Sequence, residues 1–372
     1  MPARLVASEV RTCLGDGAET FAALLAGRNG LGPLRHGDPA ALNVAHGYHI
    51  DDGGARAWAA SRWLADCARR AVAASGIDPA ARRMVALVGT GLRELAAVEA
   101  LAIGGPRFPL HRLHFGDVLQ EAVPGLRTVL TLSNACSAGG HVLALAEDHL
   151  MLGEADAVLV CGTDATTESM LAMIGRVVDQ PTDAVRPFDA DRQGVLLGDG
   201  AAAAVLVPDD DDARPAVARI AATGLSCDAH HETAPSVTGI GRAMRDALTR
   251  AGRVAGEVDL VVAHGTGTAL NDPAECAALR QVLVAAGGDP VVTAVKGAVG
   301  HTSGAAAMVN LDVAARCLTS GQVPPVVGLR RPLPDGSGLR FATGPTALTP
   351  RLVQSEAFGF GGVNAVTLVE SA

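Results

Sequence analysis

Two stretches of the chain, residues 68–91 and 244–267, repeat one succession of hydrophobic and polar positions at a constant offset. Each begins with apolar residues at helical spacing that stop at a glycine. A polar turn and a continuous apolar run come next, and a Gly-Thr-Gly turn closes each stretch, at 89–91 and 265–267. Each stretch therefore predicts a helix ended by glycine, then a buried strand, then a tight turn.

The correspondence extends to the following elements. The apolar run 129–132 leads into a turn rich in small residues and then a helix, and the run 291–294 leads into a similar turn and a helix from about Ser303. Apolar strands that alternate with helices favour parallel or mixed sheets covered on both faces. The pattern predicts two duplicated α/β halves whose functional loops meet where the strand ends face each other.

We expect two domains, residues 1–212 with a candidate nucleophilic cysteine and residues 213–372 with two candidate histidines and a glycine-rich loop. The boundary is expected near the acidic, proline-bounded run 208–215. That run of charge is typical of a solvated loop.

Cys136 lies where a β-type run ends and the next helix, expected over His141 to Leu152, begins. The unpaired N–H groups and partial positive charge of a helix N-terminus favour thiolate over thiol. Cys136 is therefore a candidate nucleophile. Since free cysteine is among the residues most often buried, a small core residue is the alternative interpretation.

The composition excludes several classes of protein. The chain has 372 residues, of which 49% are hydrophobic and only 3% aromatic, and a formal net charge of −9. Few aromatic residues and a negative charge argue against nucleic-acid binding. No stretch approaches the ~18 apolar residues of a membrane span.

The seven cysteines are scattered without a Cys-x-x-Cys pair, and the first residues lack the apolar core of a signal peptide. These features predict a reduced, cytoplasmic setting. Cys227, His230 and His231 lie close in sequence, but no second group of ligands accompanies them, so a metal site is not favoured.

Several motifs then occur in a recognisable order. They are Asn134-Ala-Cys136-Ser-Ala-Gly139, Arg186-Pro-Phe-Asp-Ala-Asp-Arg192, Gly198-Asp-Gly-Ala, His264-Gly-Thr266-Gly-Thr268 with Asn271, Asp272 and Glu275, Lys296-x4-His301, and Phe358-Gly-Phe360-Gly-Gly-x-Asn364. Together they resemble the β-ketoacyl synthase family in its elongating, Cys-His-His branch. The resemblance runs from about residue 28 to the C-terminus.

The resemblance implies that Cys136, His264 and His301 are catalytic. Carbon–carbon condensation needs a soft nucleophile to hold an acyl group as a thioester, and neutral donors to stabilise an enolate. A thiolate and two imidazoles meet these needs. Either histidine alone is more typical of a structural core residue than of a catalytic one. Both follow apolar strands in glycine-flanked turns, however, and this shared context favours the catalytic role.

The same resemblance implies supporting roles for further residues. Lys296 and Glu275 match a buried ion pair that holds the two histidine loops. The backbone N–H groups of Cys136 and Phe360 match an oxyanion hole, and the Phe360 ring matches a gate to the acyl tunnel. The remaining assignments are Asn364, which matches a support of the glycine loop, and Thr266 and Thr268, which match contacts to phosphopantetheine.

The implied fold is α/β and thiolase-like, with two pseudo-duplicated halves in a five-layered α-β-α-β-α sandwich. The implied reaction is decarboxylative Claisen condensation of a Cys136-bound acyl group with malonyl-acyl carrier protein, in polyketide or fatty-acid biosynthesis. No bound metal or redox cofactor is implied, because phosphopantetheine arrives on the carrier protein. The expected partners are acyl carrier protein and either a second copy or a ketosynthase-like chain, in a homodimer or heterodimer.

The chain departs from the family pattern at three places. It is shorter between Gly91 and Val129 and again between Ile174 and Arg186, and Val195 stands where the family usually has phenylalanine. In the family the first of these regions contributes to the dimer interface and to a wall of the acyl pocket. Acyl chain length, partner geometry and condensing efficiency therefore stay open.

The same residues distinguish the chain from related classes of enzyme. Thiolases use a second, C-terminal cysteine, whereas the last cysteine here, Cys317, precedes the glycine-rich loop. Initiating synthases pair the cysteine with His and Asn, which the Lys296-x4-His301 motif disfavours. Two alternatives remain, namely an acyltransferase that uses Cys136 without condensation, and a mainly structural subunit of a ketosynthase heterodimer.

Overall fold

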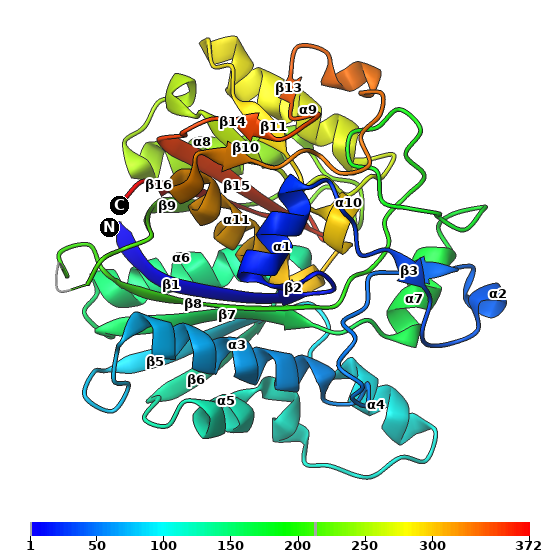
Figure 1. Cartoon of the computed structure of the whole chain (residues 1–372), viewed down its shortest axis with the longest axis vertical. Coiled ribbons are helices and arrows are strands. Elements are labelled where there is room, and N and C mark those ends of the chain that lie inside the picture. Colours follow the sequence, from blue (N-terminus) through cyan, green and yellow to red (C-terminus); the bar gives the residue numbers. More distant parts are fainter. Residues whose placement is uncertain (1, 212–213) are drawn as a thin grey trace.

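The computed structural model describes residues 2–211 and 214–372, which form five layers in the order α-β-α-β-α (Figure 1). One β layer contains β1 (Ala3–Thr12), β5 (Met84–Thr90), β6 (Thr128–Ser133), β7 (Ala157–Asp164) and β8 (Gly200–Pro208). The other contains β9 (Ala218–Cys227), β10 (Leu260–Val262), β11 (Val291–Thr293), β13 (Arg340–Phe341), β15 (Leu352–Gly359) and β16 (Val363–Glu370). The thiolase-like α/β fold expected from the sequence is confirmed.

The two β layers share one internal order. It is β1-β8-β7-β5-β6 in the first and β9-β16-β15-β10-β11 in the second, with β13 added beyond β11. β5 runs parallel to β6 and β7, and β10 runs parallel to β11 and β15. β13 is parallel to β11, and the other neighbours in each layer are antiparallel. The duplication predicted from the hydrophobic pattern is therefore confirmed, with β5 and β10 as equivalent strands.

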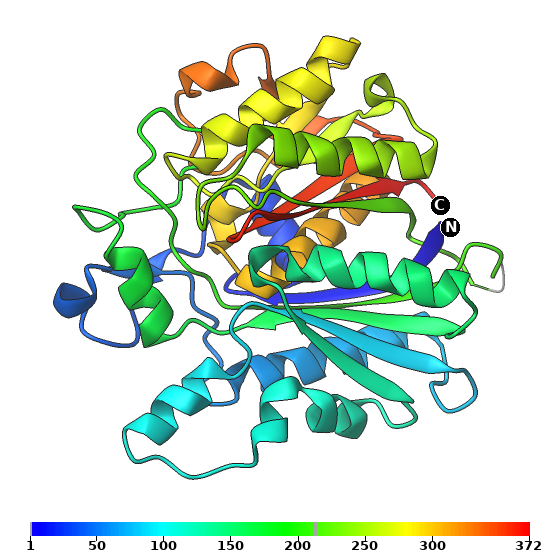
Figure 2. The same cartoon turned by 180° about the vertical axis from the view of Figure 1, so that it is seen from behind.

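Helices cover both outer faces and fill the space between the sheets (Figures 1 and 2). The outer layers contain α3 (Ala59–Ser75) and α5 (Gly116–Ala122) on one side and α8 (Val237–Ala251) and α9 (Asn271–Val282) on the other. The central layer contains α6 (Ala138–Met151) and α11 (Ala306–Ser320), both of which contact both sheets. α3 and α8 each follow the apolar spacing seen in the sequence and end at Gly76 and Gly252, which adopt the left-handed conformation.

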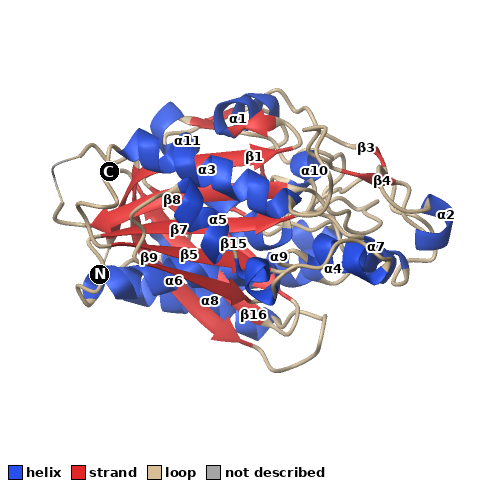
Figure 3. Ribbon diagram, turned by 90° about the horizontal axis from the view of Figure 1, so that it is seen from below, coloured by secondary structure: helices blue, strands red, loops and turns tan. Residues whose placement is uncertain are grey.

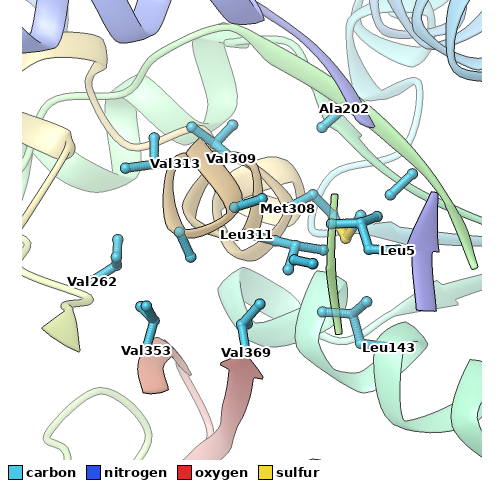
Figure 4. Packing of buried hydrophobic residues seen from close by; sticks show 14 of the residues in the cluster. Leu5, Leu143, Ala202, Val262, Met308, Val309, Leu311, Val313, Val353 and Val369 are labelled. Atoms are coloured by element: carbon cyan, nitrogen blue, oxygen red, sulfur yellow. The ribbon is translucent and has the colours of Figure 1, made fainter. Parts of the chain in front are cut away.

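The main hydrophobic core surrounds the central helices. Met308, Val309 and Leu311 on α11 pack with Leu5 from the first sheet and Val353 from the second (Figure 4). β5 and β7 are buried at every position, which explains their continuous apolar sequences. Since α11 contacts both sheets, its N-terminal turn is held in a fixed place between the two halves.

Several shorter elements complete the structure. They are β2 (Gly15–Asp16), β3 (Gly32–Pro33), β4 (His46–Gly47), β12 (Gln322–Val323), β14 (Thr346–Ala347), α1 (Gly17–Leu25), α2 (Pro39–Leu42), α4 (Leu95–Ala102), α7 (Glu168–Gly175) and α10 (Lys296–Val299). The chain ends lie near each other, at the end of the molecule opposite α2 and α7 (Figures 1 and 3). Within the described part of the chain, no helix is both long and apolar enough to span a membrane.

Two sequence expectations need comment. The predicted domain boundary between residues 212 and 213 falls outside the described residues, between the end of β8 and the start of β9. β6, which was expected to be covered on both sides, is an edge strand with several exposed residues. It forms the end of its sheet, so one row of its backbone N–H and C=O groups has no strand neighbour.

A buried carboxylate joins the turns at the centre of the molecule. Asp164 ends β7 and accepts hydrogen bonds from the N–H groups of Gly91 and Leu92, the Thr90 hydroxyl and the N–H of Gly304. A Cβ on Gly304 would lie only 2.4 Å from the Thr90 Cα, so glycine is required for this close approach. Asp164 thereby connects the Gly-Thr-Gly turn of the first half to the first turn before α11.

Candidate active site

Cys136 occupies a single 3₁₀ turn, Ala135–Ser137, that leads directly into α6. The helix starts at Ala138, three residues before the predicted His141, because this turn continues into it. Ala135 has a φ of 50°, in the left-handed region, and Ser303 has a φ of 49° at the equivalent place before α11. The two turns pack against each other, so the Cys136 turn adjoins the segment that follows His301.

The resting state of Cys136 differs from the expectation of a thiolate. Its side chain is half-buried, and burial raises the pKa of the Cys136 thiol to about 11, an effect that the nearby Lys296 charge only partly offsets. The prediction that the helix N-terminus favours the thiolate is therefore wrong for the resting protein. Desolvation of the charged form is the largest of the effects on this thiol.

His264 follows β10 and is buried. Its Nδ1 accepts a hydrogen bond from the backbone N–H of Phe358 at 3.3 Å, while its own backbone N–H donates to Glu275 Oε1 at 2.6 Å. An Nδ1 that accepts from a backbone N–H cannot carry the proton of a neutral imidazole. The proton of His264 is therefore on Nε2.

His301 has the same arrangement. It is buried, and its Nδ1 accepts a hydrogen bond from the backbone N–H of Ser303 at 3.3 Å. The rings of His264 and His301 are nearly perpendicular, with centroids 5.5 Å apart. The two turns thus bring together two imidazoles, each of which has an Nε2–H group free to donate.

Both imidazoles are neutral. Burial, together with the Lys296 charge, lowers the pKa of His264 and that of His301 well below the ordinary value for histidine. A neutral Nε2–H is a donor that does not give up its proton readily. The pair is therefore suited to stabilising a developing oxyanion by hydrogen bonding.

Lys296 begins α10 and is the only lysine of the chain, the other 29 residues of the Lys and Arg total being arginine. It is 1% exposed, and its Nζ donates to the carbonyl oxygen of His264 and lies 3.3 Å from Nδ1 of the same residue. Burial lowers the pKa of Lys296 to about 8, although Glu275 acts in the opposite direction. Its charge acts on Cys136, His264 and His301 alike.

The predicted ion pair between Lys296 and Glu275 is wrong as a direct contact. Among residues 2–211 and 214–372, no hydrogen bond or ion pair joins the two side chains. Glu275 Oε1 accepts the N–H of His264, and Oε2 accepts the N–H of Gly265 at 2.9 Å and Nδ2 of Asn271 at 2.9 Å. Two backbone N–H groups and the Asn271 side-chain amide, rather than a lysine, stabilise this carboxylate.

Thr266 and Thr268 lie on the turn after His264. Their hydroxyl oxygens are 2.9 Å apart, with Thr266 buried and Thr268 half-buried. The Asp272 carboxylate accepts the backbone N–H groups of Thr266, Gly267 and Phe188 and so fixes the turn. The threonine contacts to phosphopantetheine stay a prediction.

The glycine-rich loop after β15 lies beside the Cys136 turn. A Cβ on Gly359 would be 3.1 Å from Ser137 Oγ, so the loop backbone approaches the turn closely. Phe360 is 51% exposed, and Nδ2 of Asn364 donates to Gly362 O at 3.1 Å and to Asp228 Oδ1 at 2.8 Å. Asn364 thus supports the loop, whereas the gate and oxyanion roles of Phe360 stay predictions.

Comparison with known proteins identifies the family. The chain matches the N-terminal domain of β-ketoacyl synthases over residues 127–212 and the C-terminal domain over residues 217–330. It is 34% identical over 329 residues to nodulation protein E of Rhizobium sp. (strain N33), an alignment that covers 80% of this chain and 79% of that protein. This chain belongs to the β-ketoacyl synthase family.

Other relatives align with this chain over a shorter region. Nodulation protein E of Rhizobium meliloti is 37% identical over 65% of this chain, and 3-oxoacyl-[acyl-carrier-protein] synthase 2 of Mycobacterium tuberculosis (strain ATCC 25618 / H37Rv) is 33% identical over 63%. These alignments cover 62% and 59% of the two relatives, so the chain spans less than two thirds of their length.

Solved structures resemble this chain over its whole length. The ishigamide ketosynthase/chain length factor matches with a TM-score of 0.89 and 30% identity, covering 100% of this chain and 99% of that one. A β-ketoacyl synthase from Burkholderia phymatum STM815 matches with a TM-score of 0.87 at 22% identity, covering 100% and 99% of the two chains, which is a likeness of fold.

Three residues that the structure places in or near the site have no role among those implied by the sequence motifs. The only sequence signal for Asp164 is that it is the single acidic residue at the end of an apolar strand. The only signal for Asp272 is its position just after the His264 turn. The third, Glu356, is a buried carboxyl within β15. The uniqueness of Lys296 in the chain was a further signal that singled out this position.

The raised pKa of Cys136 leads to a testable rate profile. Alkylation by iodoacetamide should be slow at neutral pH and keep rising through pH 9, because the thiolate fraction grows about tenfold per pH unit below the thiol pKa. Lys296→Met should slow the reaction further at each pH, since the lysine charge lowers this pKa. Peptide mass spectrometry would follow the reaction, with the exposed Cys227 as internal control. A plateau for Cys136 between pH 7 and 8 would contradict this expectation.

Proposed function

We propose that this chain is a β-ketoacyl-[acyl carrier protein] synthase that performs decarboxylative Claisen condensation in fatty-acid or polyketide biosynthesis. The observation that carries the proposal is that the two histidines share the same hydrogen bonding and the same protonation. Each accepts a backbone N–H at Nδ1 and keeps its proton on Nε2, and the turn that follows His301 packs against the Cys136 turn. Two neutral donors next to a thiol match what this condensation needs, and family membership supports the same reaction.

The first half-reaction would load the enzyme. Cys136 Sγ would attack the carbonyl carbon of an acyl thioester on the phosphopantetheine arm of acyl carrier protein. The thiol proton would pass to the departing pantetheine sulfur, leaving an acyl group on Cys136 and a free carrier thiol. Because the resting thiol has a raised pKa, proton removal would accompany the attack rather than precede it.

The second half-reaction would form the new carbon–carbon bond. A malonyl thioester would lose carbon dioxide, and its carbonyl oxygen would take up the negative charge of the enolate. The Nε2–H groups of His264 and His301 would donate to that oxygen, each worth roughly 3 kcal/mol in such a site. The enolate carbon would then attack the Cys136 thioester, release the sulfur as thiolate, and give a β-ketoacyl carrier protein. The thiolate would take up one proton to complete the cycle.

Phosphopantetheine would enter as part of the substrate. The paired hydroxyl groups of Thr266 and Thr268 lie on the turn directly after His264, a place from which they would contact the arm. Their location supports acyl carrier protein as the partner. One structural relative is described as a type II PKS acyl-carrier protein in complex with its ketosynthase, which is consistent with this partner.

Intact-protein mass spectrometry would test the proposed reaction directly. Mixing the protein with acyl and malonyl carrier proteins of varied chain length should give an acyl adduct on Cys136 and then a carrier-bound product two carbons longer. Carbon dioxide release should match product formation one to one. An adduct without carbon dioxide release would indicate an acyltransferase, and no adduct with any partner combination would indicate a structural subunit. Either result would overturn the proposal.

We also propose that the chain pairs through β6 with a second copy or a ketosynthase-like chain. β6 is an edge strand whose Leu130 side chain is 40% exposed, and an unpaired strand edge is a template for pairing. The chain described as ishigamide ketosynthase/chain length factor, 30% identical, is consistent with a paired assembly.

The strand-pairing proposal predicts an effect of charge at this edge. Leu130→Asp should lower the molar mass measured by light scattering from a dimer to a single chain, because a buried, unpaired carboxylate at an interface is costly. Val254→Asp, at an exposed apolar position in the other half, is the control and should leave the mass unchanged. Equal masses for wild type and Leu130→Asp would argue against pairing through β6.

A further inference from the structure

Two buried carboxyl groups lie beneath His264, and only one of them has a full set of hydrogen-bond donors. Glu275 on α9 and Glu356 on β15 are both 0% exposed. Glu275 accepts N–H groups at both oxygens. Glu356 Oε1 accepts Nε2 of Gln354 at 2.7 Å, but within residues 2–211 and 214–372 its Oε2 has no hydrogen-bond partner.

The surroundings of Glu356 do not supply a counter-charge. Among residues 2–211 and 214–372, the charged group that acts on Glu356 is the adjacent Glu275 on α9. Asp272 on α9 and Lys296 on α10 act on Glu275, and the Nζ of Lys296 is already directed at His264. Across the sheet Glu356 pairs with Val366, and the strand on the other side, β10, is apolar. Burial and the adjacent Glu275 raise the pKa of Glu356 well above the ordinary carboxyl value.

A second negative charge in this place would be uncompensated, and a buried carboxyl in that position takes up a proton instead. A proton on Glu356 also supplies the missing donor, since a protonated carboxyl has one O–H group. Glu275, next to it, is an acceptor. Glu275 and a protonated Glu356 carry only one negative charge between them. They can therefore lie side by side without a metal ion or a second lysine to balance a second charge.

We propose that Glu356 is protonated at rest, donates this proton in a hydrogen bond to Glu275, and thereby acts as a positioning residue for His264. In this arrangement β15 positions His264 in two ways, at its ring and at its backbone. The N–H of Phe358 fixes the ring at Nδ1, and Glu356 holds the carboxylate that fixes the backbone N–H of His264. Asn310 Nδ2 adds a connection, with bonds to Glu356 O at 3.1 Å and Ala263 O at 3.3 Å.

The first test measures thermal stability against pH and requires no enzymatic activity. A carboxyl protonated in the fold and ionised in the unfolded chain makes folding take up a proton, so it lowers stability progressively as pH rises above the unfolded pKa. Glu356→Gln keeps an N–H donor for Glu275 and an acceptor for Gln354 but removes this proton uptake. Its melting temperature should therefore exceed that of wild type by an amount that grows from pH 5 to pH 8.

A matched control is Glu147→Gln on α6. Glu147 is also buried and accepts the N–H of Thr223 at one oxygen, while its other oxygen has no hydrogen-bond partner among the described residues. Burial raises its pKa to about 7. This variant should show a similar trend with pH but no change in condensation. A pH-independent difference between wild type and Glu356→Gln would overturn the proposal, as would a wild-type stability that depends on sodium or potassium, which would indicate a bound cation.

The second test rests on the proposed function and addresses positioning. Glu356→Gln should keep the kcat for malonyl decarboxylation within about threefold of wild type, whereas Glu356→Leu, which has no donor, should lower it by about ten- to a hundredfold with little change in KM. The wild-type kcat should decline at high pH as Glu356 loses its proton, and that of Glu356→Gln should not. Equal activity of the Gln and Leu variants would overturn the positioning role. If wild type did not condense at all, the proposed function would fail while the stability test still decided the protonation state.

Discussion

Replacing either His264 or His301 by alanine is expected to lower malonyl decarboxylation by about a hundred- to a thousandfold while acylation of Cys136 remains measurable. Each substitution removes one of the two Nε2–H donors that would stabilise the enolate oxygen. The loading step develops its charge at a different oxygen, on the acyl thioester carbonyl. Each variant should therefore lose decarboxylation, measured as carbon dioxide release, but keep the loading step, measured as the acyl adduct on Cys136.

The measurement combines released carbon dioxide with the mass of the intact protein after exposure to acyl carrier protein. His149→Ala is a suitable control, because His149 lies near the end of α6 and pairs with Glu154 at 2.9 Å, away from the Cys136 turn. The double variant should be little worse than the poorer single variant if both donors act on one oxygen. Normal condensation by both single variants would refute the assignment.

The second large effect concerns the nucleophile. Cys136→Ala should abolish the acyl adduct and reduce condensation by at least about a thousandfold, because no other group in the site can form the thioester. The substitution removes a half-buried sulfur at the start of α6 and should leave the melting temperature close to that of wild type. Thermal unfolding would show that lost activity is not lost folding.

Cys227→Ala is the control for this experiment, since Cys227 is the exposed cysteine and ends β9 rather than preceding a helix. It should keep both adduct and product. An adduct that persists in Cys136→Ala would show that another residue is acylated. Peptide mapping of that adduct would then locate the true nucleophile.

The hydrophobic pattern was sufficient to predict the duplicated architecture. Strands such as β5 and β7 are apolar along their whole length because both faces are covered, and helices such as α8 end at a glycine with left-handed backbone. These are local properties that a short stretch of sequence carries. The start of α6 was misplaced because the 3₁₀ turn at Cys136 merges with the helix without a capping residue to mark it.

The partners of buried charges were harder to predict. Lys296 and Glu275 have opposite charges, and this suggested an ion pair. Glu275 instead accepts the backbone N–H groups of His264 and Gly265. Every residue except proline has such a donor, so the sequence does not show which ones a carboxylate will meet. The raised pKa of Cys136 could not be predicted either. Its main cause is desolvation, which depends on the groups that pack around the thiol in the fold. Gln354 and Glu356 look like the solvent-facing side of a strand, but β15 is covered on both faces.

The single, buried lysine has a consequence for the chemistry of the protein surface. Activated acyl thioesters slowly acylate exposed ε-amino groups without any enzyme, and an enzyme that handles such substrates is continually exposed to them. The only ε-amino group of this chain is Lys296, which is 1% exposed and directed at His264. The remaining 29 basic side chains of the Lys and Arg total are guanidinium groups, which stay protonated and do not compete as nucleophiles. The surface of this chain therefore offers no lysine side chain for unintended N-acylation.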